Sequence, residues 1–67
     1  MYRFSVSFYD IVDDLTVHTE IKMDVSMYEN TIEGAQAIAW KWAVEQAISM
    51  QTDYRTFTGL ELIACTM

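Results

Sequence analysis

The feature that most constrains the fold is a run of alanines at every fourth position between Asn30 and Met50. On a helix this spacing places the four small side chains one above another along a single side. This alanine ridge consists of Ala35, Ala39, Ala43 and Ala47. Because methyl side chains let a helix backbone come close to a neighbouring layer, we expect the ridge to lie on a sheet formed by the rest of the chain.

The sequence offers three ways to begin this helix. Asn30 followed three residues later by Glu33 matches a capping box, and Thr31 alone supplies a hydroxyl that can accept a hydrogen bond from the first free amides. Ser26 with Glu29 is a rival start, one turn earlier. The pattern leaves the choice among them open.

Two strands are predicted before the helix. Apolar and polar residues alternate from the beginning of the chain to about Val12, which is typical of a half-buried strand. Asp13 and Asp14 then favour a hairpin turn. The alternation resumes over residues 15–25, so that each strand has one core face and one wet face. The predicted core positions are Phe4, Val6, Phe8, Leu15, Val17, Thr19, Ile21, Met23 and Val25.

A last strand is predicted from Phe57 to Met67, with Gly59 as a possible bulge. The sequence leaves open which side chains of this strand point toward the helix, because a bulge reverses the side on which the following residues point. Without a bulge, the side chains toward the helix are Leu60, Leu62 and Ala64, and those on the open side are Glu61, Ile63, Cys65 and Met67.

The order strand, strand, helix, strand predicts an α+β fold. A crossover through the helix returns the last strand antiparallel to the first, where the two can pair. The result is a three-stranded antiparallel sheet ordered 2-1-3, with the helix on one face. The chain has no proline and only two glycines, so we find no linker and expect residues 1–67 to form a single domain.

The predicted helix has more apolar surface than one sheet contact needs. Its apolar arc covers roughly 240°, whereas a stripe a little over 100° wide is enough to pack on a core. The excess includes part of Trp40, Val44, Ile48 and Ile38, and tryptophan is enriched in binding hot spots. Trp40, Val44 and Ile48 are therefore predicted to contact a partner. Scattered exposure of apolar residues on a small domain is the alternative.

Charge narrows the class of partner. Ten acidic residues against four basic ones give a formal charge of −6, so the chain is expected to be repelled by phosphate backbones. A basic protein surface, such as that of a nucleic-acid-binding complex, is the better match. The alternative is a solvated face that keeps the protein soluble. The predicted partner-binding acids are Asp10, Asp13, Asp14, Glu20 and Asp24.

No residue pattern indicates catalysis, a metal site or a cofactor. The three aspartates near the turn lack the further ligands and the glycine of a calcium loop. His18 has no second histidine or cysteine nearby, and Cys65 has no positive neighbour in the sequence to activate it. Ser5 and Ser7 have no plausible base. We therefore expect a protein that is not an enzyme and has neither metal nor cofactor.

Two further observations predict the cellular compartment of the protein. A single cysteine cannot form an internal disulfide, and no apolar run is long enough for a signal peptide or a membrane span. The sequence therefore predicts a cytoplasmic protein that does not enter a membrane.

In size, acidity and element order, the chain resembles small anti-CRISPR proteins and other short proteins of phages and mobile elements. The resemblance rests on two strands, the helix entry Asn30-Thr31-Ile32-Glu33-Gly34-Ala35 and a last strand, although such helix starts more often have glutamate where Gly34 stands. It implies an inhibitor that blocks the nucleic-acid site of its partner without any catalysis.

Two functions are thus expected from the sequence. The first is a small non-catalytic protein-binding module that inhibits a basic, nucleic-acid-handling partner. The second is a structural homo-oligomer, such as a homodimer, that buries the apolar helix flank or the free edges of the second and third strands against a copy of itself.

Overall fold

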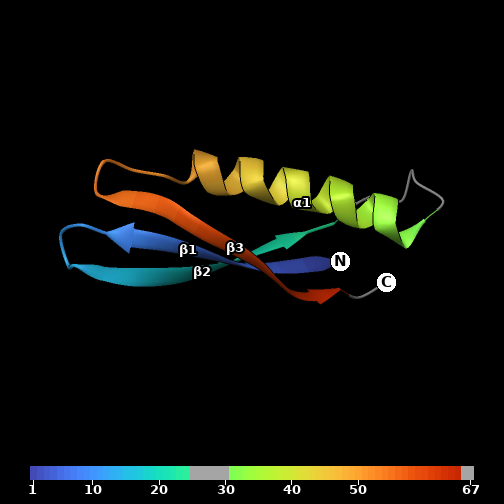
Figure 1. The fold of residues 1–67 in the computed structure, drawn as a ribbon, viewed down its shortest axis with the longest axis horizontal. Coiled ribbons are helices and arrows are strands. Elements are labelled where there is room, and N and C mark those ends of the chain that lie inside the picture. The colour runs from blue at the N-terminus through green and yellow to red at the C-terminus, as the bar shows by residue number, and fades with distance from the viewer. Residues whose placement is uncertain (25–30, 66–67) are drawn as a thin grey trace.

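Three strands and one helix make up the described part of the computed structural model, residues 1–24 and 31–65 (Figure 1). Their order is β1 (Tyr2–Asp10), β2 (Leu15–Met23), α1 (Ile32–Ser49) and β3 (Arg55–Cys65). The strands form one antiparallel sheet in the order β2-β1-β3, and α1 lies along one face of it. The predicted α+β architecture is confirmed.

The central strand β1 supplies most of the core. Its helix-facing side chains Tyr2, Phe4, Val6 and Phe8 are each at most 3% exposed, because β2 and β3 flank them and α1 covers them. The residues between them lie on the opposite, open face of the sheet. Paired in register with β1, the alternate residues of β2 point to the same two faces, as the alternation predicted.

The alanine ridge is the contact surface of α1. All four of its alanines are at most 1% exposed. Three of them, Ala35, Ala39 and Ala43, pack with Tyr2 and Phe4, and Ala47 packs with the second half of the core. The molecule measures 44 × 18 × 14 Å, and its radius of gyration of 13.2 Å exceeds the roughly 11 Å expected of a compact chain this long. The fold is therefore a thin, elongated pair of layers.

Thr31 is the N-cap of α1. Its hydroxyl accepts a hydrogen bond of 3.1 Å from the amide of Gly34, and its own backbone is extended. Of the three predicted starts, the structure thus uses Thr31, while residues 26–30 lie outside the described part of the chain. The helix ends at Ser49, one residue before the predicted end, and the Met50 amide closes the last turn on the carbonyls of Gln46 and Ala47.

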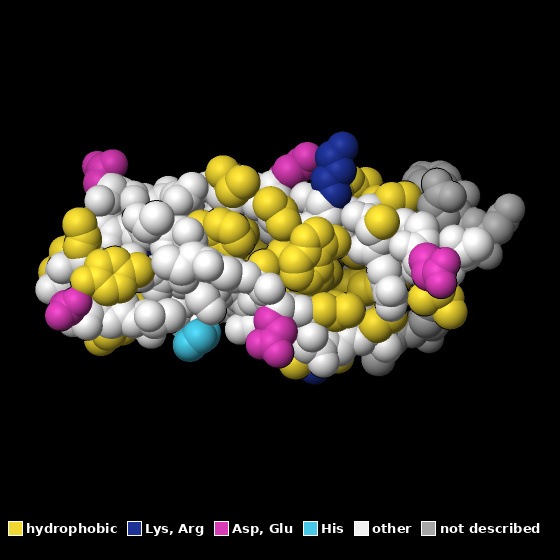
Figure 2. All heavy atoms as spheres, viewed as in Figure 1, with side chains coloured by type: hydrophobic (Ala, Val, Ile, Leu, Met, Phe, Trp, Pro, Cys, Tyr) yellow, Lys and Arg dark blue, Asp and Glu magenta, His cyan; other side chains and the backbone are white. Residues whose placement is uncertain are grey.

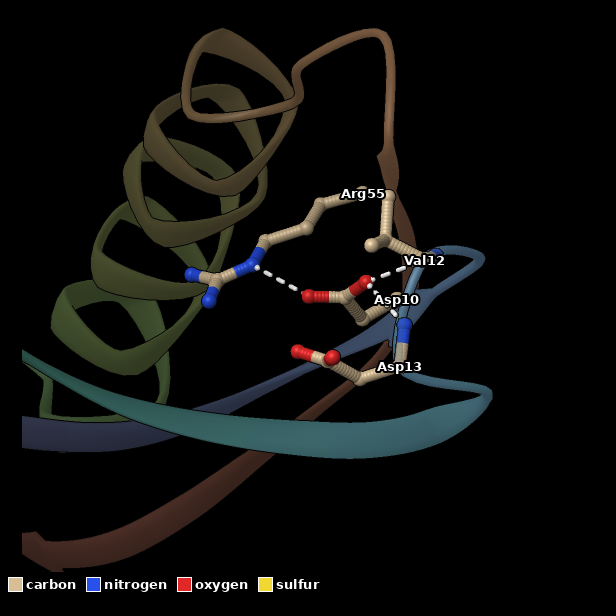
Figure 3. Close-up of polar contacts among 4 residues, drawn as sticks. All are labelled: Asp10, Val12, Asp13 and Arg55. Atoms are coloured by element: carbon tan, nitrogen blue, oxygen red, sulfur yellow. Dashed lines mark hydrogen bonds and ion pairs between the residues drawn. The ribbon is translucent and has the colours of Figure 1, made fainter.

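The prediction that β1 continues to about Val12 is wrong, because the Asp10 side chain ends the strand (Figure 3). Oδ1 of Asp10 accepts hydrogen bonds from the amides of Val12, at 2.9 Å, and Asp13, at 3.1 Å. These bonds bend the backbone into a turn, which Asp14 completes with a φ of 51°. Oδ2 of Asp10 pairs with Nε of Arg55 at 3.3 Å. The carboxylate therefore joins the hairpin turn to the start of β3.

Two bulges in β3 settle which way its residues face. The pairing with β1 shifts between Phe57 and Gly59 and again between Leu62 and Ala64, which leaves Thr58 and Ile63 as the extra residues. The first shift confirms the bulge predicted at Gly59. Leu60 and Leu62 pack on the core as predicted.

Glu61, opposite Ser5, keeps the open face assigned to it without a bulge, whereas the second bulge reverses the assignment of Ala64 and Cys65. Ala64 lies opposite Arg3 on the open face, and Cys65 lies opposite the buried Tyr2. The strand begins at Arg55, two residues before the predicted start, and Thr66 and Met67 lie outside the described residues. The prediction that β2 continues past Met23 to Val25 also reaches a residue outside this range.

The alanine ridge predicts that enlarging a ridge alanine destabilises the protein, whereas enlarging an exposed alanine of the same helix does not. Ala39→Leu inserts three carbon atoms where α1 meets the sheet, and it is expected to lower the free energy of unfolding by about 1–3 kcal/mol. The control, Ala37→Leu, adds the same atoms at an exposed position and should change stability little. Urea unfolding followed by circular dichroism measures both. Equal effects would contradict the close contact.

Asp10 predicts an acid-dependent loss of stability. The amide of Asp13, together with Arg55 and the amide of Val12, lowers the pKa of Asp10 from its ordinary value, despite the opposing effect of burial. A lowered pKa in the folded state stabilises the protein above the unfolded-state pKa of about 4, and this stabilisation disappears as the pH falls through the folded-state value.

Asp10→Asn should therefore lower the Tm by several degrees at neutral pH, and the difference from the parent protein should shrink as the pH falls below about 4. Asp53→Asn removes the same charge at an exposed site and serves as the control. Thermal unfolding across the pH range measures the effect. A gap between Asp10→Asn and the parent that is unchanged at low pH would contradict the assigned role.

Candidate functional site

An exposed apolar strip runs along α1 beside the alanine ridge. It consists of Trp40, Val44 and Ile48, which follow one another at four-residue spacing and so share one side of the helix. Trp40 is 44% exposed and Ile48 52% exposed, while Val44 is half-buried. Hydrophobic side chains gather across the middle of the face shown in Figure 2. The structure thus brings the three predicted anchor residues together in what we call the α1 strip.

Trp40 is held in place although nearly half of its surface is open. Its ring meets that of Phe4 edge to face, with 5.9 Å between the centroids and 66° between the planes. Phe4 itself is 1% exposed and belongs to the core. One side of the indole is therefore fixed by the core and the other faces outward. Because the indole is already held in one orientation, it loses little conformational entropy when a partner covers it.

Apolar surface is exposed elsewhere on α1 as well. Trp42, 39% exposed, lies on the other side of the ridge, and Ile32, 53% exposed, lies eight residues before Trp40 on the same side of the helix as the α1 strip. Lys41 and Glu45, four residues apart on the outer surface of α1, are exposed too. The excess of apolar helix surface predicted from the sequence is confirmed.

Asp10 does not belong to an exposed acidic surface, so this prediction is wrong. Its side chain is only 4% exposed, and its carboxylate is taken up by two backbone amides and Arg55 (Figure 3). The reason is that Asp10 points to the helix side of β1, as do Phe8 and Val6. A partner cannot reach this carboxylate without opening the turn.

The remaining predicted acids are exposed but do not form one patch. Asp13 and Asp14 lie in the hairpin turn, where Asp14 accepts a hydrogen bond from Tyr9. Asp24 follows the far end of β2, which is nine residues or about 30 Å away. Glu20 lies on the open face of the sheet, on the side away from α1. The acidic side chains in Figure 2 are likewise set apart from one another.

A row of polar pairs crosses the open face between β1 and β2. Glu20 pairs with Arg3, which lowers the pKa of Glu20. Ser7 and His18 lie directly opposite each other, with 3.1 Å between Oγ and Nδ1. The expectation that Ser7 has no plausible base nearby is therefore wrong. Counting the register back from the hairpin turn would have revealed this pair.

The contact of Ser7 with His18 lies on an open surface. A serine nucleophile also needs a group that orients the histidine and donors for an oxyanion. The described residues form no pocket around the pair, and within residues 1–24 and 31–65 no three His, Cys, Asp or Glu residues come close enough to hold a metal ion. On this arrangement the pair is best described as a cross-strand hydrogen bond of the sheet.

Tyr2 and Cys65 lie side by side at the far end of the core. The Tyr2 side chain is buried, and its hydroxyl has no hydrogen-bond partner among the described residues. Burial raises the pKa of this phenol, and the neighbouring Cys65 raises it further. Cys65 itself is exposed. The pair marks the end of the helix-facing side of β1 and β3.

No described helix has the length and apolar character needed to cross a membrane. Comparison with known proteins found no matching family model, no matching curated protein and no matching solved structure. The resemblance to small anti-CRISPR proteins therefore stays a prediction, based on size, acidity and element order.

Proposed function

We propose that this chain is a small, non-catalytic protein-binding module of the cytoplasm. In this proposal the α1 strip docks on a larger protein with a basic, nucleic-acid-handling surface and blocks that surface. The observation that carries the proposal is the position of Trp40, which is anchored on Phe4 and still 44% exposed. Rigid, partly exposed tryptophans are frequent hot spots of protein interfaces.

The charge of the chain supports a basic partner. The formal charge is −6, and the exposed acids Asp13, Asp14, Glu20 and Asp24 are spread over the molecule. Spread charge gives long-range attraction that speeds up encounter, while affinity comes from the buried apolar contact. The α1 strip then provides most of the binding free energy, and the acids provide steering that salt weakens.

The proposal predicts a difference between two flanks of one helix. Ile48→Glu places a charge in the α1 strip and should weaken binding about thirtyfold or more, as expected for a hot spot worth about 2 kcal/mol. Trp40→Glu should do the same. Trp42→Glu makes the same change at a tryptophan outside the strip and should leave binding nearly unchanged, which makes it the matched control.

The measurement is affinity capture from cells that express the chain, followed by titration of each captured protein by calorimetry. Circular dichroism first establishes that each variant is folded. The expected partner is a basic protein whose binding weakens with salt and is displaced by nucleic acid. Capture of the same proteins, at the same affinity, by the parent, Ile48→Glu and Trp42→Glu would refute the α1 strip as the docking site.

A further inference from the structure

The two edges of the sheet differ in how open they are to another strand. β3 forms one edge and is interrupted by bulges at Thr58 and Ile63. β2 forms the other edge and pairs with β1 without any shift over all nine residues. Among the described residues, β2 has no strand on its outer side. Bulges disturb an edge and hinder further pairing, whereas a straight edge presents a regular row of backbone donors and acceptors.

We propose that two copies of this chain pair through their β2 strands. The strands would run antiparallel about a twofold axis at Thr19, the middle residue of β2, and would join the two sheets into one. Every residue of β2 then has a partner. The resulting pairs are Leu15 with the partner's Met23, Thr16 with the partner's Lys22, Val17 with the partner's Ile21, His18 with the partner's Glu20, and Thr19 with the partner's Thr19.

These pairs match in chemistry on both faces of the sheet. On the helix face, Leu15 is 48% exposed in the single chain, and pairing would cover it with a methionine. On the open face, His18 would meet a carboxylate. The Ser7 contact uses Nδ1 of His18 and leaves its Nε2 available for that carboxylate. No two like charges face each other, so the edge is complementary to itself.

Other registers fit less well. Moving the axis one residue toward Glu20 would place two Glu20 carboxylates opposite each other and His18 opposite Lys22. Moving it the other way would oppose two His18 rings and carry Lys22 past the end of the partner's β2, which begins at Leu15. A pairing of odd with even positions would bring the apolar face of one copy against the polar face of the other. Charge and facing therefore select the register centred on Thr19.

The pairing goes beyond the proposed binding function and requires no residue of the α1 strip. Because paired residues of two antiparallel strands point to the same face, both α1 helices would lie on one side of the joined sheet. The other side would be a continuous polar surface. If the protein does not dimerise, the proposed docking through Trp40 still stands. If docking through Trp40 is refuted, the proposed dimer still stands.

The test measures the dimer dissociation constant by sedimentation equilibrium over a dilution series. Thr16 faces the partner's Lys22, so Thr16→Glu is expected to tighten the dimer by roughly fivefold and Thr16→Lys to weaken it by roughly fivefold. Net charge alone predicts the opposite order, because the chain already carries −6 and an added glutamate increases repulsion between copies.

Thr56 provides a matched control. It is exposed and lies opposite Tyr9 on the open face, as Thr16 does, but it belongs to β3 instead of β2. Thr56→Glu and Thr56→Lys should therefore follow net charge only, with slight weakening and slight tightening respectively. Circular dichroism establishes that all four variants are folded.

The proposal is supported if the parent protein dimerises and the Thr16 variants shift the dissociation constant in the stated order. It is overturned if the protein is monomeric up to its solubility limit. It is equally overturned if a dimer forms whose response to the Thr16 variants follows net charge or equals the response to the Thr56 variants, since the contact would then lie elsewhere.

Discussion

The contact between the alanine ridge and β1 determines both the core and the surface of this molecule. Small side chains bring the helix close to the sheet, so the space between the layers is filled mainly by large side chains of the sheet such as Phe4 and Phe8. A helix that uses alanines for its contact must place its large apolar residues elsewhere. Trp40 and Ile48 are exposed for this reason. The close contact of α1 with the sheet and the exposed apolar surface of α1 therefore both follow from the alanines of the ridge.

The two faces of the sheet perform different tasks. The helix-facing side holds the core, with the buried carboxylate of Asp10 at its end. That carboxylate is compensated by two amides and Arg55, which is what a buried charge requires. The open face is polar and carries the pairs of Arg3 with Glu20 and Ser7 with His18. Exposed pairs of this kind contribute little to stability, and the register is set by the buried face and by the hairpin turn.

Most of the fold could be predicted from the sequence because its signals are local and periodic. Strand alternation, the alanine ridge and the sheet order all follow from spacing. What the sequence did not reveal depends on contacts between distant residues. The carboxylate of the buried Asp10 is compensated in part by Arg55, 45 positions later, and the reversal at Ala64 and Cys65 depends on a second bulge that no glycine marks. The α1 strip was predictable as one side of a helix, whereas the acids proved scattered because each faces a different way.

The central position of β1 also affects how the chain folds. β1 is the first strand in the sequence, and its partner β3 is the last. The hairpin of β1 and β2 can form early from neighbouring residues, but the other edge of β1 stays open until β3 has been synthesised and can dock. During that interval the most deeply buried of the three described strands has an unpaired edge. The nascent chain is therefore most exposed to misassociation just before its final strand emerges.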